Sequence, residues 1–178
     1  MSSHLTWVPE PHPTWDDDKK RVIGGAPEGT FVLPFHEGDE LPGEWWSARE
    51  DDTVVGYGRL DIGWGGDAEI LLAVDPQRQQ HGIGSFVLEH LEQEAAGRGL
   101  NYVYNTIREH EGRELVHDWL VVRGFRGAID GDLRKRVGAR WPAAGRNAEP
   151  TPYDPAKEDL GPGREEAGGY VDVNDHRY

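Results

Sequence analysis

The stretch VDPQRQQHGIGSFVLEHL, from Val74 to Leu91, contains residues whose spacing suits anion binding. An apolar segment ends in a polar turn with two glycines, Gly82 and Gly84, and a helical pattern follows. The first N–H groups of a helix have no partner within the helix, and the helix dipole favours negative charge beside them. The N–H groups of Gln80 to Ser85 could therefore surround a pyrophosphate. Alternatively, the glycines only let the chain turn from strand into helix.

Cysteine chemistry is excluded by the sequence, and metal binding is not supported by it. The chain has no cysteine, which excludes disulfides, thiolate metal sites and a cysteine nucleophile. Its eight histidines form no His-x-His or His-Glu-x-x-His pattern, so their spacing predicts no metal site. We therefore expect neither a metal nor a covalent cysteine intermediate.

The charge balance is strongly acidic, with 33 Asp and Glu residues against 19 Lys and Arg residues. Proteins hold a phosphate backbone mainly with Lys and Arg, so this balance argues against nucleic acid as the main partner. A cationic or amine-bearing partner fits the composition better.

The elements that would position the turn begin with two strands, predicted over residues 44–50 and 53–62. The sequences EWWSARE and TVVGYGRLDI flank a tight acidic turn there, which is typical of an antiparallel hairpin. The segment AEILLAV, from Ala68 to Val74, is a nearly unbroken apolar run of strand length. Such a run predicts a central strand buried on both faces.

Helices and strands alternate after this run. A helix is predicted from Ile83 to about Arg98, where apolar residues recur at helical spacing until Gly99. The sequence LNYVYNTI indicates the next strand, and GFRGAIDGDLRKRV indicates two short strands about an Asp-Gly turn. Between them a second helix is predicted over residues 111–123, with a core stripe of Leu115, Val116, Trp119 and Val122. This order predicts a mixed α/β sheet with flanking helices.

The two ends of the chain differ from this central part. Residues 1–43 contain six prolines and no sustained period, apart from a short possible helix from Trp15 to Ile23. We expect this irregular segment to form part of the acceptor side, with a core over residues 44–141. Residues 142–178 are rich in Pro, Gly and charge, which predicts a flexible acidic tail. Its end, GYVDVNDHRY, is a possible recognition element for a second copy of the chain or another protein.

The sequence shows no feature of a membrane protein. No apolar run approaches the roughly 20 residues of a membrane span. The first residues, MSSHLTWVPEPHP, lack the basic-then-apolar order of a signal peptide. We expect a cytoplasmic protein that does not act at a membrane.

The turn and its neighbours together resemble a known family. The stretch Val74-Asp75-Pro76 followed by Gln79-Gln80-His81-Gly82-Ile83-Gly84 is similar to the acetyl-CoA motif of the GNAT family of N-acetyltransferases. That motif has Gln or Arg, two residues, Gly, one residue, and Gly or Ala, directly after the fourth strand. The segments TVVGYGRL, AEILLAV and WLVVRGF resemble the third strand, the fourth strand and the final helix of this family. The resemblance covers about residues 43–137.

The resemblance implies a fold and a co-substrate. The expected fold is a GNAT-type α/β architecture with a mixed, mostly antiparallel sheet, in which the fourth and fifth strands part. The expected co-substrate is acetyl-CoA, whose pantetheine arm pairs with the exposed backbone of the fourth strand. The implied contacts to pantetheine are Leu72, Ala73 and Val74. The implied pyrophosphate contacts are Gln79, Gln80, His81, Gly82, Ile83, Gly84 and Ser85.

Amide formation needs a free-base amine, so a side chain or water must take a proton from the acceptor. Glu69 is the first candidate base, because its place near the start of the fourth strand resembles that of a catalytic glutamate in relatives. It stands one residue nearer the motif Val than is usual, and such an offset turns a side chain to the other face unless a bulge compensates. Tyr104 and His117 are the next candidates. Alternatively, Tyr104 is a core aromatic and His117 is a solvent-exposed residue, and neither takes part in catalysis.

Two positions depart from the family pattern. The family often has a tyrosine four residues before the Gly of the Gly-Phe ending, acting as general acid, but here that residue is Leu120. The last helix of the family often begins with asparagine, where this chain has Arg113. The usual general acid is therefore absent.

These observations predict an N-acetyltransferase that moves an acetyl group from acetyl-CoA to a primary amine, by direct attack in a ternary complex. A small amine or amino acid is the first choice of acceptor, and a protein N-terminus or lysine is the second. The alternative is a CoA-binding or adaptor protein without catalysis, acting through its C-terminal tail. The absent tyrosine favours that alternative.

Overall fold

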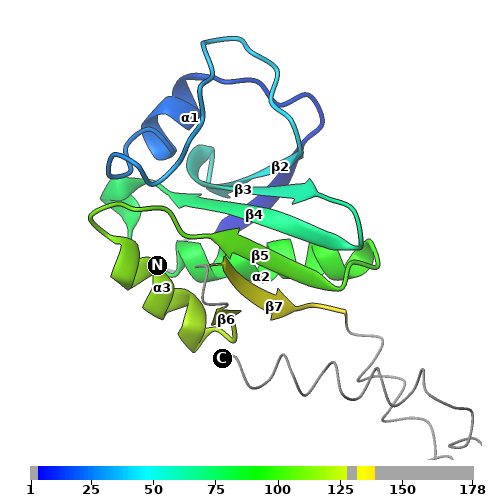
Figure 1. The fold of residues 1–178 in the computed structure, drawn as a ribbon. Helices are drawn as coiled ribbons and strands as arrows, with labels where there is room; N and C mark the ends of the chain where they lie inside the picture. Colours follow the sequence, from blue (N-terminus) through cyan, green and yellow to red (C-terminus); the bar gives the residue numbers. More distant parts are fainter. Residues whose placement is uncertain (1–3, 128–131, 139–178) are drawn as a thin grey trace, which may run out of the picture.

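The computed structural model describes residues 4–127 and 132–138. The chain forms one seven-stranded sheet in the order β1-β2-β3-β4-β5-β7-β6 (Figure 1). Only β4 and β5 run parallel, so the sheet is mixed and mostly antiparallel, as the sequence predicted. The strands are β1 (Leu5–Glu10), β2 (Glu44–Glu50), β3 (Thr53–Ile62), β4 (Asp67–Val74), β5 (Tyr102–Thr106), β6 (Arg126–Gly127) and β7 (Asp132–Arg136).

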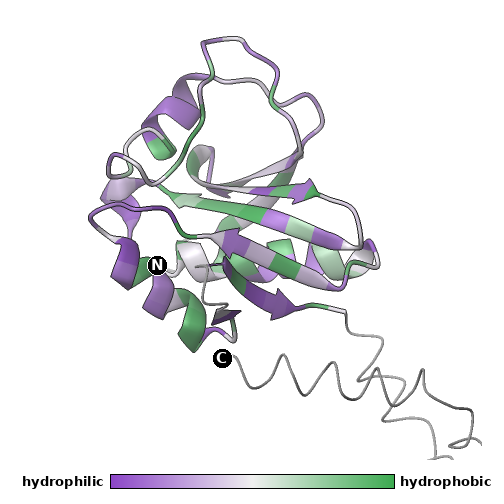
Figure 2. Cartoon of the chain, viewed as in Figure 1, coloured by the Kyte–Doolittle hydropathy of each residue, from purple (hydrophilic) through white to green (hydrophobic). Residues whose placement is uncertain are grey.

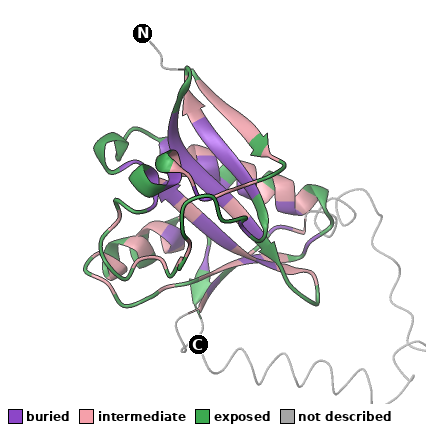
Figure 3. Ribbon diagram, turned by 90° about the horizontal axis from the view of Figure 1, so that it is seen from above, coloured by how far each residue is buried: buried purple, intermediate pink, exposed green. Residues whose placement is uncertain are grey.

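Helices cover both faces of the sheet. Helix α1 (Asp17–Val22) lies on one face, while α2 (Ile83–Gly97) and α3 (Arg113–Val122) lie on the other (Figure 1). One apolar cluster joins α2 and α3 to the sheet, and a second joins α1 and residues 31–35 to the opposite face. The central strands are buried between these layers, and their apolar residues stand out against the polar outer surfaces of the helices (Figures 2 and 3).

The predicted hairpin is confirmed with its boundaries. Strands β2 and β3 pair antiparallel about Asp51 and Asp52, and Asp51 adopts a positive φ of 56°. A left-handed residue is what a tight two-residue turn requires. The register shifts between Ala48 and Arg49, whose partners are Gly56 and Val54, so Val55 is the extra residue of a bulge in β3.

The N-terminal segment contains more structure than the sequence indicated. The short predicted helix is confirmed as α1, whose first turn is capped by Asp16, accepting a hydrogen bond of 2.9 Å from the Lys19 backbone N–H. Strand β1 was not predicted. It pairs with β2 alone and includes Pro9, and a proline is tolerated in such an edge strand because its missing N–H is not needed there.

The apolar face of α3 differs from the predicted stripe. Leu120 is buried, and Val116 and Trp119 pack partly against the core, whereas Leu115 and Val122 are 78% and 80% exposed. Leu115 and Val122 are seven residues apart and therefore lie on one helix face, about 100° away from Val116. The prediction joined two adjacent faces into one stripe, and only one of them contacts the sheet.

The Asp-Gly turn at residues 130–131 and the tail over residues 142–178 lie outside the described residues. None of the described helices is long and apolar enough to cross a membrane.

Candidate active site

The centre of the sheet opens between β4 and β5. These strands pair over only three residues each, and Glu69 and Tyr104 form the last pair. Strand β4 continues for five more residues, to Val74, and stays paired with β3 throughout. Toward β5, the backbone beyond Glu69 has no strand partner in the described part of the chain. The side-chain amide of Asn105 donates a hydrogen bond of 3.2 Å to the Ile70 carbonyl at this point.

A pocket of about 110 Å³ lies at this opening. Strand β4 contributes residues 69–72, and the end of β5 with the following loop contributes residues 105–108. Residues 30–33, from the segment between α1 and β2, complete the lining on the face of the sheet that α1 covers. Arg59 of β3, His110 of the loop after β5 and Val116 of α3 also line the pocket.

Glu69 lies in the lining of this pocket. Its register partners are Asp61 on β3 and Tyr104 on β5, so these three residues form one row across the sheet. Glu69 belongs to the same strand face as Leu71 and Ala73, which pack in the cluster beneath α1. The offset noted in the sequence therefore leaves Glu69 on the pocket side.

Tyr104 is half-buried beside this carboxylate. Burial and the negative charges of Glu69 and Asp61 raise the pKa of the Tyr104 hydroxyl above its ordinary value of 10.0. The guanidinium of Arg134 lies over its ring, 5.3 Å from the centroid. Tyr104 therefore keeps its proton at neutral pH, which suits a hydrogen-bond or proton donor and does not suit a base.

His117 lies on α3 and is half exposed. Its Nδ1 atom is 3.1 Å from a carboxylate oxygen of Asp118, the next residue. The described pocket lining includes His110 and Val116 but not His117. The structure thus brings Glu69 into the pocket, places Tyr104 next to it, and leaves His117 on the outer side of α3.

The turn before α2 has the backbone that an anion site requires. Gln80 and Gly82 adopt positive φ angles of 68° and 79°. In the described structure no backbone N–H from Gln80 to Ser85 donates to a protein acceptor, and the first bond of the helix runs from Phe86 N–H to the Gly82 carbonyl. A Cβ atom at Gly82 would meet nothing within 4 Å, so the space in front of the turn is open.

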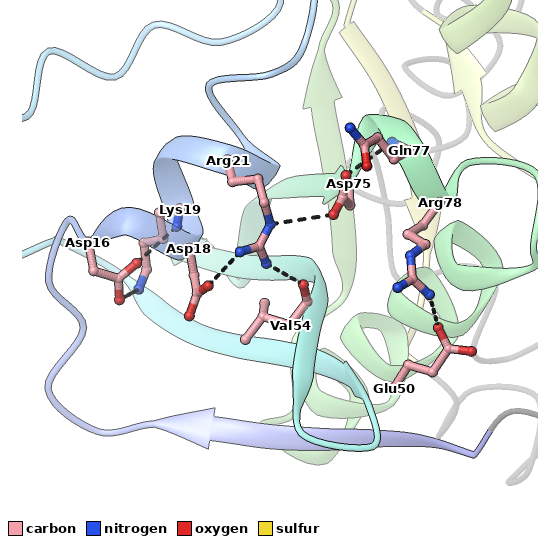
Figure 4. Close-up of polar contacts among 9 residues, drawn as sticks. All are labelled: Asp16, Asp18, Lys19, Arg21, Glu50, Val54, Asp75, Gln77 and Arg78. Carbon is pink, nitrogen blue, oxygen red and sulfur yellow. Dashed lines mark hydrogen bonds and ion pairs between the residues drawn. The ribbon is translucent and has the colours of Figure 1, made fainter.

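Ion pairs fix this turn to the rest of the fold (Figure 4). Buried Asp75, at the end of β4, accepts a hydrogen bond of 3.0 Å from the Gln77 N–H and lies 3.4 Å from the Arg21 guanidinium of α1. Arg21 also donates to the Val54 carbonyl at 2.7 Å. Arg78 pairs with Glu50 at the end of β2. The turn is therefore held from two sides, which limits its movement when a ligand binds.

Residues of α3 contact the start of α2, and the sequence pattern did not single them out. Trp119 lies against Gly84, where a Cβ atom would come within 3.2 Å of the indole ring. Arg123 stacks on Trp119 at 3.7 Å and donates a hydrogen bond of 3.1 Å to the Ser85 hydroxyl. The second glycine of the motif therefore has a packing role between helices, which only the folded structure reveals.

Leu120, at the position where the family often carries a tyrosine, is 3% exposed and belongs to the core cluster under α2 and α3. No hydroxyl is supplied from this position. Among the described residues no group of three or more His, Asp or Glu side chains is arranged to hold a metal ion.

The comparisons with known proteins agree with this architecture. The model of the acetyltransferase (GNAT) family matches residues 5–120. This match covers more than half of the chain, and the chain therefore belongs to the GNAT acetyltransferase family. No curated protein matches the chain significantly.

Three solved structures illustrate the likeness in fold. Ribosomal-protein-S18-alanine N-acetyltransferase from Escherichia coli is 15% identical over 85% of this chain and all of its own, with a TM-score of 0.54. N-acetylglutamate synthase from Neisseria gonorrhoeae, complexed with coenzyme A and N-acetyl-glutamate, is 17% identical over 77% of this chain and 36% of its own, with a TM-score of 0.55. A GNAT-family protein from Desulfovibrio desulfuricans is 21% identical over 53% of this chain and 70% of its own, with a TM-score of 0.48. At these identities the likeness to the first two structures shows the fold alone.

Proposed function

We propose that this protein transfers an acetyl group from acetyl-CoA to a primary amine by direct attack in a ternary complex. The observation that carries this proposal is the opening between β4 and β5, which has a carboxylate-lined pocket at its start and a turn of unpaired N–H groups at its far end. The turn can hold the pyrophosphate with the N–H groups of Gln80 to Ser85. The free side of β4 from Leu72 to Val74 can pair with the amides of pantetheine.

The chemistry assigned to the pocket can be written with its protons balanced. The ammonium form of the acceptor first loses one proton to Glu69 or to water held by it. The amine nitrogen attacks the thioester carbonyl, a C–N bond forms, and the tetrahedral nitrogen then loses its second proton. The C–S bond breaks, and the thiolate takes up one proton to leave as CoA thiol. One proton is released to solvent per amide formed.

Residues of the pocket would share these tasks. Glu69 is the proposed base, because it is the carboxylate of the lining and forms no ion pair with a described residue. Tyr104 stays protonated beside it and can donate a hydrogen bond to a water or to the developing oxyanion. His117, on the outer side of α3, is the remaining candidate. The proton for the thiolate would come from water, since Leu120 has none to give.

The proposed acceptor is a small amine or amino acid, and a protein N-terminus or lysine is the second choice. Residues 30–33 cover the pocket on the side of α1, which limits the space for a long chain. The buried Leu120 favours one other candidate function, that of a CoA-binding protein without catalysis.

Release of CoA thiol from acetyl-CoA, measured across a panel of small amines, amino acids and peptides, tests the proposal. Turnover that depends on the amine is expected for an acetyltransferase, with the acetylated amine confirmed by mass spectrometry. A protein that binds acetyl-CoA but releases no thiol with any amine would support the non-catalytic alternative instead.

A further inference from the structure

The pocket carries more positive than negative charge, unlike the chain as a whole. Arg59 and Arg108 are the permanent cations of its lining, and Glu69 is its carboxylate. The complete chain has a formal net charge of −14. A local excess of cation in an acidic protein attracts a ligand that bears negative charge. The composition of the whole chain pointed to a cationic or amine-bearing partner, and the charge of the pocket adds a preference for negative charge on the same ligand.

The guanidinium of Arg59 lacks a polar partner within the described structure. Its Nε atom is shielded from solvent and has no hydrogen-bond acceptor, and the centroid of the Trp45 ring lies 5.8 Å from its Cζ atom. Across residues 4–127 and 132–138, Arg59 and Arg108 are the arginines without an ion pair or hydrogen bond. A buried donor without an acceptor destabilises the protein, and an acceptor supplied by a ligand would relieve this cost.

The phosphates of CoA are poorly placed to be that ligand. Arg59 lies opposite Leu71 on β4, three residues before the strand ends at Val74. At the rise of a β-strand, three residues separate Arg59 from the start of the turn by roughly 10 Å. The N–H groups assigned to the pyrophosphate lie further along the chain, from Gln80 onward.

Arg59 and Glu69 are spaced to bind the two ends of a small zwitterion. Arg59 pairs with Leu71 and Asp61 pairs with Glu69, so Arg59 and Glu69 are diagonal neighbours on one face of the sheet. Residues in such diagonal positions are about 7–8 Å apart, and both side chains line the pocket. A zwitterion could bind between Glu69 and Arg59. Its ammonium group would face the carboxylate of Glu69, and its carboxylate would face the guanidinium of Arg59.

We infer that the acceptor carries a carboxylate close to its amine, as an amino acid does, and that Arg59 binds this carboxylate. The inference rests on the proposed function, because it names the acceptor class for the same pocket. The planar guanidinium can bind a carboxylate with two parallel hydrogen bonds. Arg108, exposed on the loop after β5, adds positive charge at the rim.

The first test compares amino acids with their own carboxamides as acceptors, in the wild type and in Arg59→Gln. Rates are expressed per concentration of free-base amine, because an amide lowers the pKa of the neighbouring amine. The wild type should prefer the acids in kcat/KM by at least about tenfold, the effect of one hydrogen bond to a charged group. Arg59→Gln should lose this preference while its acetyl-CoA affinity and its far-UV circular dichroism stay unchanged. Arg126→Gln, an exposed change on β6, is the matched control and should retain the preference.

The outcomes separate the inference from the proposed function. Amine-dependent turnover with no preference for acids, or a preference that survives in Arg59→Gln, would overturn the inference and leave the acetyltransferase proposal standing. If no amine is turned over, the proposed function fails, and the site is then tested by calorimetric titration of the CoA-loaded protein with the amino acids. Binding at least about tenfold tighter in the wild type than in Arg59→Gln would support the carboxylate site, and equal or absent binding would overturn it.

Discussion

Glu69 and Tyr104 face each other across β4 and β5 as the last pair before the two strands part. Their pairing couples a carboxylate in the pocket to a hydroxyl whose pKa is raised first by burial and then by that same carboxylate. The sheet therefore holds a row of interacting groups in fixed register at the opening.

Replacing Glu69 with Gln should slow catalysis without weakening acetyl-CoA binding. General-base catalysis contributes about 100-fold or more, so kcat should fall by roughly this factor. Asp61→Asn is the matched control, because it removes a carboxylate from the same row outside the pocket lining. A kcat in Glu69→Gln within a few-fold of the wild type would move the search to Tyr104→Phe and His117→Ala.

The same substitution should change the titration of Tyr104. Burial is the largest cause of its raised pKa, and the charge of Glu69 is the next. Removing that charge in Glu69→Gln should lower the pKa of Tyr104 toward 10.0, while burial keeps it above that value. Ring-labelled tyrosine followed by NMR between pH 8 and about pH 12 measures this shift, with Tyr104→Phe to assign the signal. An unchanged Tyr104 titration would show that the two side chains are not electrostatically coupled.

The turn can be tested with two nearly isosteric substitutions at Gly82. Its φ of 79° is tolerated by Asn and Asp better than by other residues with a side chain, so Gly82→Asn and Gly82→Asp carry similar strain. Only Asp adds a negative charge beside the pyrophosphate. Calorimetric titration with acetyl-CoA should show binding at least about tenfold weaker for Asp than for Asn, or 1.4 kcal/mol. Equal affinities in two folded variants would count against the phosphate assignment.

The regular spacing of apolar residues made part of this fold predictable from sequence. The observed bounds of β2 and β3 are those predicted. The observed bounds of β4 and α2 differ from the predicted ones by one residue at one end. Strand β1 escaped prediction because it is short, lies at an edge and contains Pro9, so no period marks it. The exposed Leu115 and Val122 on α3 show a second limit, since an apolar residue reveals nothing about which helix face meets the sheet.

The candidate site was predictable only where it depends on a local motif. The turn from Gln80 to Ser85 is a continuous segment, so its conformation follows from nearby glycines and the helix that begins there. The orientation of Glu69 depends on strand register, which a one-residue shift reverses. The missing partner of Arg59 and the contact of Trp119 with Gly84 depend on residues distant in sequence. No local pattern signals either of them.

Buried tyrosines should make the fold sensitive to alkaline pH. The pKa of Tyr57, beneath α1, is raised far above 10.0 by burial and by the charges of Asp16 and Glu10. Because the folded-state pKa of Tyr57 exceeds its unfolded value, its stabilisation is fully present below pH 10 and is lost as pH rises above it. The free energy of unfolding should fall by about 1.4 kcal/mol per pH unit for each such tyrosine. Urea unfolding of Tyr57→Phe and the wild type at pH 8 and about pH 11 should show a shallower fall in the variant, and parallel falls would contradict this origin.

Gly84 offers a test of whether the second motif glycine serves packing. Alanine is favoured over glycine in a helix by about 0.5–1 kcal/mol, but at Gly84 its Cβ atom would lie 3.2 Å from the Trp119 ring. We therefore expect Gly84→Ala to leave the free energy of unfolding unchanged or lower it in the wild type. In a Trp119→Leu background the contact is gone, so the same change should stabilise the protein by about 0.5–1 kcal/mol. Urea unfolding of the four proteins in this double-mutant cycle gives the coupling energy, and acetyl-CoA titration of the same set shows whether the packing also positions the turn. Additive effects on stability would mean that Trp119 does not constrain Gly84, and the glycine would then be required for ligand approach alone.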